Sequence, residues 1–309
     1  MLNVLWGIAE DDSLTAVRRA LERRHARYFF LDQRMLLNCE VETSVDDTVR
    51  GLVRIRDQVC DLAEVKSVYL RNYALALLTE FRQVGGTGIA WQRTQAVDDA
   101  LRSWVEVTPA LAINRFSAMA AAESKPYQSR LIRSAGFYTP ATLITTDAEA
   151  AHEFWKRNGT VVYKSISGTR SIVSRLGSGH ADRFTDIRWC PTQFQQYIAG
   201  RDFRVHVVGA EAFACQIDSN ADDYRYAARN GGSVRLSPCR LPQDCTDRCV
   251  ALATQFGFTV AGVDLRQTRQ GQWYCFEING SPTFTYYEAP TSQAVADAIA
   301  NLMVAAAPT

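Results

Sequence analysis

The sequence has no excess of charge of either sign. Its 309 residues include 34 Lys and Arg and 33 Asp and Glu, a net charge of +1. A protein that binds nucleic acid or an anionic membrane through a broad surface needs a clear basic excess. No stretch approaches the roughly 18 consecutive apolar residues of a membrane helix. No Lys or Arg precedes the short apolar run at the N-terminus, as a secretory signal requires. We therefore expect a cytoplasmic protein that binds neither nucleic acid nor membrane.

Several common catalytic and metal motifs are also missing. The chain has only four histidines, and none lies in an HExxH motif or a nucleophile elbow. The lack of GxGxxG disfavours a dinucleotide enzyme, and the lack of GxxxxGK[ST] excludes a P-loop. The eight cysteines form no CxxC pair, and no nearby histidine completes a zinc set. We expect scattered thiols in a reducing compartment.

The composition that remains is that of an ordinary globular chain, with 47% hydrophobic and 22% charged residues. Its length predicts about two domains. The apolar run 2–8 predicts a buried strand, followed by a helix capped by Asp12 or Ser13 and a strand over 28–31. Further strands are expected over 40–45, 48–56 and 66–70. This first part is predicted to be a small α/β domain that ends near Asn114.

The second part opens with a helical stretch, 116–135, in which Pro126 must occupy a first turn or break the helix. Strands are expected over 160–164, 172–176, 193–198, 204–208, 211–216, 260–265 and 273–278, and helices over 246–256 and 292–306. The pattern again mixes helices and strands, so the fold class is α/β (α+β).

Oxygen-bearing side chains gather near the C-terminus. Asp264 is expected at the end of one strand, and Glu277 and Asn279 lie two apart on the next strand, so they point to the same face. Two carboxylates and an amide oxygen are hard ligands suited to Mg²⁺ or Mn²⁺. Ordinary polar strand ends have the same appearance, and spacing alone does not separate the two interpretations.

Lys164 ends an apolar strand and precedes a polar loop that contains Ser167 and Gly168. An ammonium group, hydroxyls and loop N–H groups can hold a phosphate chain, although many loops of this composition bind nothing. The segment Gln195–Ile198 can stack a purine, and Asp202 can accept hydrogen bonds from ribose. A plain strand and hairpin would look alike.

Three arginines are candidates for anion binding. Arg204 can reach phosphate with its planar fork. Arg225 and Arg229 share a face if that segment is helical, and they can bind a phosphate or carboxylate bidentately. A solvated basic face is the alternative for this pair.

Taken in order, these segments resemble the ATP-grasp superfamily. The stretches that carry the likeness are VVYKSISG, FQQYI, GRDFRVHVVG, YRYAARNGG, and AGVDL followed by FEING. They are most similar to ligases of the RimK type and to the maturases of microviridin-like peptides (graspetides). The likeness covers about residues 114–309. In the preceding region VKSVYLR is loosely similar to the peptide maturases.

The resemblance implies a pre-ATP-grasp domain over 1–114 and an ATP-grasp domain over 115–309, with a small lid lobe over 115–195 and a metal-binding lobe over 196–309. It implies nucleotide contacts for Lys125, Lys164, Ser167, Gly168, Gln195, Gln196, Tyr197, Ile198 and Asp202. It implies phosphate or acyl-phosphate contacts for Arg204, Arg225 and Arg229. It implies that Asp264, Glu277 and Asn279 bind two Mg²⁺ ions.

The sequence departs from the family pattern at two points. Gln196 stands where related enzymes often carry Glu, and FEING continues as Ser281-Pro282-Thr283-Phe284 instead of asparagine-proline-asparagine. The implied activity is ligation of a carboxylate to an amine or hydroxyl through an acyl phosphate, with release of ADP and phosphate. Three functions stay open: a ligase that modifies a peptide, a RimK-type ligase that adds an amino acid or amine to a small molecule or protein tail, and a nucleotide-binding scaffold. The likeness is compatible with a homodimer.

Overall fold

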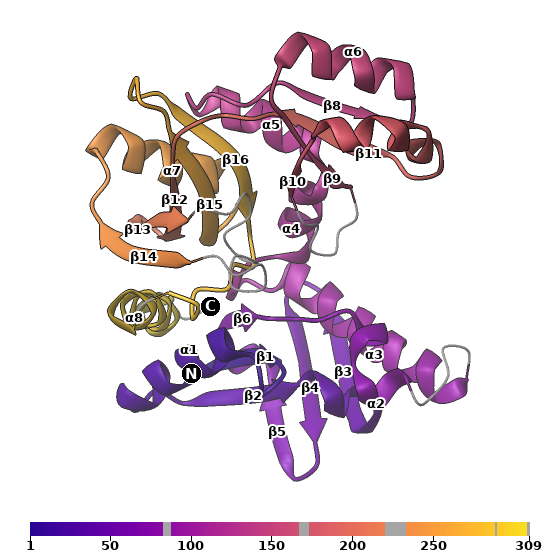
Figure 1. Ribbon diagram of the computed structural model, residues 1–309. Helices are drawn as coiled ribbons and strands as arrows, with labels where there is room; N and C mark the ends of the chain where they lie inside the picture. Colours follow the sequence, from indigo (N-terminus) through magenta and orange to yellow (C-terminus); the bar gives the residue numbers. More distant parts are fainter. Residues whose placement is uncertain (83–87, 167–172, 220–232, 288, 308–309) are drawn as a thin grey trace.

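The computed structural model describes residues 1–82, 88–166, 173–219, 233–287 and 289–307. The described strands form four sheets. Figure 1 shows an N-terminal region with two of them, a five-stranded sheet backed by helix α7, and a smaller four-stranded sheet covered by helix α6. The mixed α/β class expected from the sequence is confirmed.

The N-terminal region is built on a parallel sheet in the order β2-β1-β6-β7. Its strands are β1 (Leu2–Gly7), β2 (Tyr28–Asp32), β6 (Val65–Leu70) and β7 (Leu111–Ile113). Helix α1 (Asp12–Arg23) joins β1 to β2, so the expected βαβ unit is confirmed. The predicted cap was wrong by one residue. Asp11 caps α1, because its extended backbone directs its carboxylate to the Leu14 N–H.

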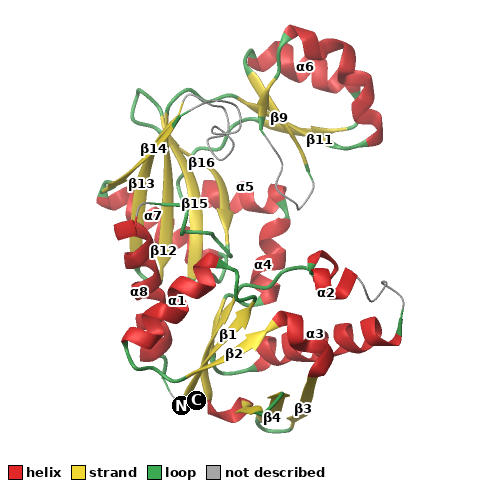
Figure 2. Cartoon of the chain, turned by 60° about the horizontal axis from the view of Figure 1, so that its bottom comes forward, coloured by secondary structure: helices red, strands yellow, loops and turns green. Residues whose placement is uncertain are grey.

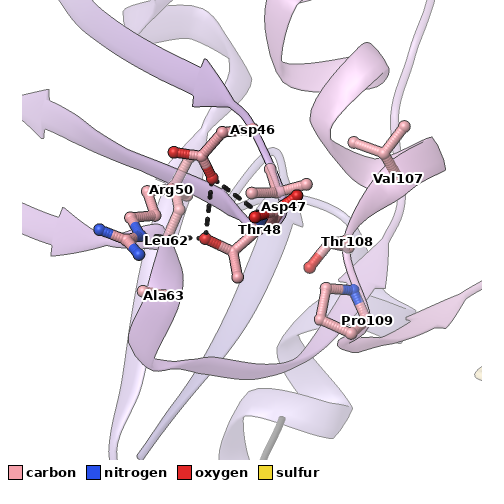
Figure 3. A pocket seen from close by; sticks show the side chains of 10 residues that line it. Asp46, Asp47, Thr48, Arg50, Leu62, Ala63, Val107, Thr108 and Pro109 are labelled. Carbon is pink, nitrogen blue, oxygen red and sulfur yellow. Dashed lines mark hydrogen bonds between the residues drawn. The ribbon is translucent and has the colours of Figure 1, made fainter.

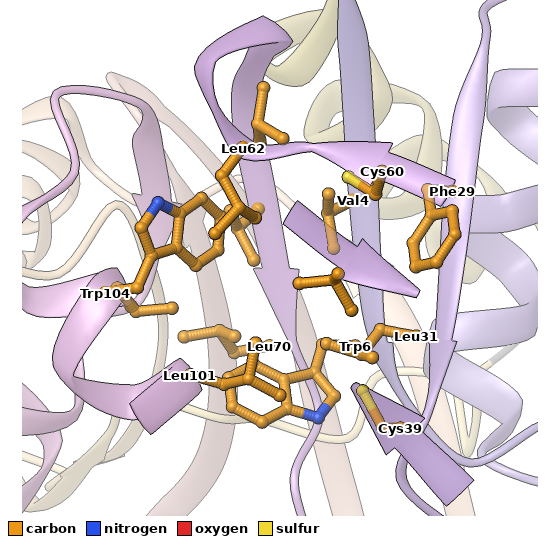
Figure 4. Packing of buried hydrophobic residues seen from close by; sticks show 14 of the residues in the cluster. Val4, Trp6, Phe29, Leu31, Cys39, Cys60, Leu62, Leu70, Leu101 and Trp104 are labelled. Carbon is orange, nitrogen blue, oxygen red and sulfur yellow. The ribbon is translucent and has the colours of Figure 1, made fainter. Parts of the chain in front are cut away.

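A three-stranded antiparallel sheet and helix α3 (Ile89–Val107) complete this region. The sheet contains β3 (Cys39–Val45), β4 (Val49–Ile55) and β5 (Gln58–Asp61). Short helices connect these parts. They are the 3₁₀ helices η1 (Gln33–Asn38), η2 (Leu62–Glu64) and η3 (Leu75–Leu77) and the α-helix α2 (Thr79–Arg82). Trp6, Leu101 and Trp104 pack in the shared core, so this core joins both sheets to α3 (Figure 4).

The smaller sheet has the antiparallel order β10-β9-β11-β8. Its strands are β8 (Thr142–Thr145), β9 (Val161–Ser165), β10 (Ser174–Arg175) and β11 (Thr192–Gln196). Helix α6 (Ala148–Asn158) and η4 (Ser178–Trp189) contribute Phe154 and Phe184 to a core with Phe194 of β11. This separate apolar cluster makes the smaller sheet a packing unit of its own.

The five-stranded sheet is antiparallel, in the order β14-β13-β12-β15-β16. Its strands are β12 (Arg201–Val208), β13 (Glu211–Ser219), β14 (Val234–Cys239), β15 (Val260–Gln267) and β16 (Trp273–Asn279). Alternate residues such as Phe203, Val205 and Val263 pack beneath α7 (Gln243–Gln255). The intervening residues point to the opposite face, and these include the charged candidates.

Helices α4 (Phe116–Glu123) and α5 (Lys125–Ser134) replace the single helix predicted over 116–135. Ser124 between them is extended, and Pro126 lies in the first turn of α5, where its missing N–H costs nothing. Asp264 does not end its strand as predicted. β15 continues to Gln267, because cross-strand pairing with β12 extends over its last residues.

The C-terminal helix α8 (Ala289–Ala305) returns to the N-terminal region and lies along α1 (Figures 1 and 2). Val295 and Ile299 pack with Leu14 and Val17 in one buried cluster. Asn114, which follows β7, links the N-terminal region to the five-stranded sheet through its buried side-chain amide. Its Nδ2 donates to one carbonyl in β15 and to one just after β16, and its Oδ1 accepts from the N–H groups at and just before the start of β15.

All eight cysteines are free thiols, six of them buried, as the scattered spacing predicts. Among the residues that the structure describes, no helix is both long and apolar enough to cross a bilayer.

Candidate active site

A row of charged side chains crosses the face of the five-stranded sheet that lies opposite α7. Arg204 of β12 is paired in register with Asp264 of β15, and Asp264 is paired with Glu277 of β16. Residues directly opposite each other on neighbouring strands share a face. Arg204 Nη1 lies 2.7 Å from Asp264 Oδ1, and the arginine side chain is only 9% exposed. The strand pairing therefore brings together three predicted site residues.

Two lysines from separate elements converge on Glu277. Lys125 opens α5, and its Nζ lies 2.7 Å from Glu277 Oε1; Lys164 is on β9 of the smaller sheet, with its Nζ 4.0 Å from Oε2. Burial opposes ionisation of the carboxyl, but Lys125 and then Lys164 outweigh it, so the pKa of Glu277 is lowered. Glu277 is therefore an anion at neutral pH, and it meets cations from two sides.

Asn279 lies on the same face, opposite Gly262 of β15. Its Oδ1 accepts a hydrogen bond of 2.8 Å from the backbone N–H of Ser281. A Cβ at Gly262 would lie 2.1 Å from Arg204 Nη2 and 2.7 Å from Pro282 Cβ. The glycine therefore leaves the space that the arginine head and the proline occupy.

Asp264, Glu277 and Asn279 together offer two carboxylates and an amide oxygen at neighbouring register positions. Mg²⁺ favours such oxygen donors and usually takes one or two protein carboxylates, completing its shell with water and phosphate. Over the described ranges, no group of three or more His, Cys, Asp or Glu is placed to hold a metal. The set of two carboxylates and one amide oxygen fits Mg²⁺ by its donor chemistry, with the amide supplying the third donor.

The predicted purine-binding segment spans the junction between the two sheets. Gln195 and Gln196 end β11, whereas Tyr197 and Ile198 lie in the connection to β12 and not in a strand as predicted. The Gln195 amide donates to Thr142 Oγ1 at 3.1 Å. The chain leaves the smaller sheet after Gln196, so this segment is a linker between sheets.

Arg266 is a residue that the sequence reasoning missed. Its Nε and Nη2 donate to the two carboxylate oxygens of Asp202 at 2.6 and 2.8 Å, and its Nη1 donates to the Ile198 carbonyl at 2.8 Å. Its guanidinium carbon lies 5.5 Å from the Tyr197 ring centroid and 5.2 Å from that of Phe276. Arg266 thus ties the linker to the sheet. The one sequence signal was a cation two residues after Asp264.

His206 was not among the predicted site residues, although its place in a strand beside Arg204 is as the sequence indicates. It lies two residues after Arg204 on the same face and is fully buried, with its ring 5.0 Å from that of Tyr287 and 6.3 Å from that of Phe284. Burial, and secondly the charge of Arg204, hold the pKa of His206 well below its usual range. The imidazole is therefore neutral at pH 7.

Four predicted site residues lie outside the described residues: Ser167, Gly168, Arg225 and Arg229. Hollows of the described part of the structure also lie away from the charged row. A cavity of about 460 Å³ lies beside the β3–β4 turn and is lined by Asp46, Thr48 and Arg50 among others (Figure 3). A second, of about 200 Å³, lies between η4 and the smaller sheet. Neither is lined by the charged row.

Residues 122–303 match the family described as the RimK-like ATP-grasp domain. A protein named probable alpha-L-glutamate ligase from Photobacterium profundum is 26% identical over 206 residues, or 63% of this chain and 67% of that protein. A protein of the same name from Aliivibrio salmonicida is 28% identical over 155 residues, 47% of this chain and 50% of that protein. The chain thus spans half to two thirds of the length of these relatives.

Solved structures match nearly the whole chain. The macrocyclase MdnC of Microcystis aeruginosa, bound with its precursor peptide MdnA, has a TM-score of 0.80 at 22% identity and covers 98% of this chain and 99% of its own. The ATP-grasp ligase PsnB, complexed with a minimal precursor variant, Mg and ADP, has a TM-score of 0.82 at 21% identity, with 98% and 97% covered. These likenesses confirm the expected ATP-grasp fold. Because the domain match covers more than half of the sequence, the chain belongs to the RimK-like ATP-grasp family of ligases.

Proposed function

We propose that the protein is an ATP-dependent ligase that joins a carboxylate to an amine or hydroxyl of a peptide through an acyl phosphate. The observation that carries this proposal is the convergence of Lys125 and Lys164 on Glu277, beside the Arg204–Asp264 pair. Cations from a helix and from two sheets, gathered around two carboxylates, suit a polyphosphate with bound metal.

In this proposal Lys125 and Lys164 bind phosphate oxygens. Asp264, Glu277 and Asn279 hold two Mg²⁺ ions, which neutralise phosphate charge when bound. Arg204 faces the negative charge that develops on the transferred phosphoryl group, and its buried position keeps it oriented before the reaction starts. Arg225 and Arg229 are assigned the same role from the sequence.

The linker Gln195–Ile198 holds the adenine, chiefly through its backbone groups. Asp202, oriented by the two hydrogen bonds from Arg266, accepts from the ribose. Ser167 and Gly168 are assigned contacts with the phosphates from the sequence. The substitution of Gln196 for the usual Glu leaves these backbone contacts in place.

The reaction has two steps. A carboxylate oxygen of the substrate attacks the γ-phosphorus, the bond to the bridging oxygen breaks, and ADP leaves. The amine nitrogen or hydroxyl oxygen then attacks the acyl carbon, the carbon–oxygen bond to phosphate breaks, and phosphate leaves as the nucleophile loses its proton. Water must be excluded, because it would hydrolyse the acyl phosphate.

A peptide substrate is supported by two solved structures that share this fold and hold precursor peptides. MdnC and PsnB, both complexed with precursor peptides, match 98% of the chain, including its N-terminal region. The probable alpha-L-glutamate ligases match only 47–63% of it. Their name nevertheless supports a second candidate function, the addition of an amino acid to a small molecule or protein tail.

The test is product analysis with Mg-ATP and two acceptor pools, one of amino acids and one of peptides rich in Asp, Glu, Lys, Ser and Thr. Peptide-dependent ADP release, with a peptide that loses the mass of one water, supports the proposal. ADP release with amino acids alone supports the second candidate. Formation of AMP would overturn the acyl-phosphate chemistry, and the absence of any nucleotide binding would overturn the proposal as a whole.

A further inference from the structure

Arg71, the last residue of VKSVYLR, is buried where the N-terminal parallel sheet faces the five-stranded sheet. It directly follows β6, and its partner Asp11 follows the neighbouring strand β1. Arg71 Nη2 lies 2.9 Å from Asp11 Oδ2, and the two side chains are 8% and 3% exposed. Asp11 is held in turn by the Leu14 N–H at 2.7 Å and the Tyr73 hydroxyl at 2.8 Å. The guanidinium is therefore fixed from the N-terminal side.

The other guanidinium donors of Arg71 reach the segment 281–283, which follows β16. Nη1 donates to the carbonyl and hydroxyl oxygens of Ser281, both at 2.9 Å, and to the Pro282 carbonyl at 3.1 Å. Nη2 lies 3.4 Å from Thr283 Oγ1. A planar fork with five N–H donors can hold several acceptors at once, which a lysine ammonium cannot reproduce. One side chain thus positions three consecutive residues.

Segment 281–283 contacts two members of the candidate site. The Ser281 N–H donates to Asn279 Oδ1 at 2.8 Å. The Pro282 side chain and the Arg204 guanidinium both fill the space above Gly262, where an added Cβ would meet each of them. The orientation of the Asn279 amide and the position of the arginine head therefore depend on where this segment lies.

Stability alone does not account for a buried Arg–Asp pair at this place. The desolvation of two charges largely offsets their attraction, and an apolar pair of similar volume often stabilises a protein as well or better. What an apolar pair cannot do is hold the backbone of 281–283 in one position. The hydrogen bonds across the junction therefore point to a positioning role.

We propose that Arg71 is a positioning residue through which the N-terminal region orients Asn279 and Arg204, so that the metal site is complete only when the two regions are docked. This inference rests on the proposed function, because it assigns Asn279 to a divalent cation. It predicts that loss of Arg71 weakens cation binding without any change in a residue of the charged row.

The experiment titrates Mn²⁺ into the full-length protein with saturating ADP, with free Mn²⁺ read by electron paramagnetic resonance, and records thermal unfolding of each variant. The variants are Arg71→Met and Arg71→Lys. The matched control is Arg24→Ala, because Arg24 also joins the two regions, through Asp297 and Asn301 at 2.7 Å each, but contacts no part of 281–283.

We expect Arg71→Met to weaken Mn²⁺ binding by about 10-fold or more, the usual effect of losing a partner that orients a metal ligand. Arg71→Lys should lie between it and the wild type, and Arg24→Ala should bind as the wild type does. Equal binding by Arg71→Met and the wild type, or an equal loss in Arg24→Ala, overturns the inference. If Arg71→Met does not fold, wild-type binding by Arg71→Lys overturns it. Failure of the wild type to bind Mn²⁺ with ADP refutes the proposed metal-nucleotide site itself.

Discussion

Replacement of Glu277 by Gln separates a role in chemistry from a role in folding. The change keeps the shape of the side chain and removes the negative charge that faces Lys125 and Lys164. The paired side chains of Lys125 and Glu277 are 29% and 34% exposed, and such partly exposed ion pairs contribute about 0–1 kcal/mol. Removal of the carboxylate also relieves its desolvation. The free energy of unfolding should therefore change by less than about 1 kcal/mol.

Activity should respond far more strongly. Changing a residue that merely orients a metal ligand already lowers metal affinity or activity by about 10–100-fold. Glu277 is proposed to be a ligand itself. We expect ATP-dependent ligation to fall by at least about 100-fold, measured as ADP release and product mass. Glu40→Gln is the matched control, since Glu40 forms an exposed ion pair with Arg54 far from the row. Wild-type turnover by Glu277→Gln would refute the metal role.

The Glu277→Gln variant should also differ from the wild type in how its stability depends on acid pH. The lysines lower the pKa of Glu277 in the folded protein below its unfolded value. Such a carboxyl contributes stability that is present above its unfolded pKa, about 4.3, and is lost as the pH falls through the folded pKa. As the pH falls through this acidic range, the free energy of unfolding should therefore decrease more for the wild type than for Glu277→Gln. Urea unfolding at several pH values measures this difference. Parallel curves for both proteins would contradict the charge assignment.

Three further changes test other parts of the structure. Lys164→Ala should raise the KM for ATP by about 10-fold or more, as expected for the loss of a charge-assisted contact worth roughly 1.5–3 kcal/mol, and an unchanged KM would remove Lys164 from the phosphate site. Asn114→Ala leaves buried carbonyls and N–H groups without their partner, so the free energy of unfolding in urea should fall by about 3 kcal/mol or more. Arg266→Ala releases Asp202 and the Ile198 carbonyl, so nucleotide affinity measured by calorimetry should fall, whereas Mn²⁺ binding without nucleotide should not.

Elements with a clear local pattern were predicted well. The βαβ unit, the hairpin of β12 and β13 and the pair β15–β16 all follow alternation or helical spacing within a short stretch. Each of these patterns is set by one buried face, so neighbouring residues carry the information. The predicted ligand set requires β15 to pair with β16, and the observed register meets this requirement.

Elements without such a pattern were missed. Strand β8 alternates exposed and half-buried residues and contributes little to a core, and helix α6 buries only Ala151 and Phe154. Strand β14 lies at the edge of its sheet, where no fully buried residue marks it. Their positions depend on tertiary packing and edge pairing, which local periodicity does not record.

In the candidate site, too, some residues were predicted from the sequence and others were missed. Family likeness grouped Lys125, Lys164 and Glu277, although up to 152 positions separate them. It did not point to Arg266 or to the role of Arg71, because each contacts other parts of the protein, including backbone carbonyls, and a carbonyl acceptor leaves no trace in residue type. Residues that touch the reacting groups are thus readable as motifs. Residues that hold those groups in place become readable only when the chain is folded, and here they come from both ends of the sequence.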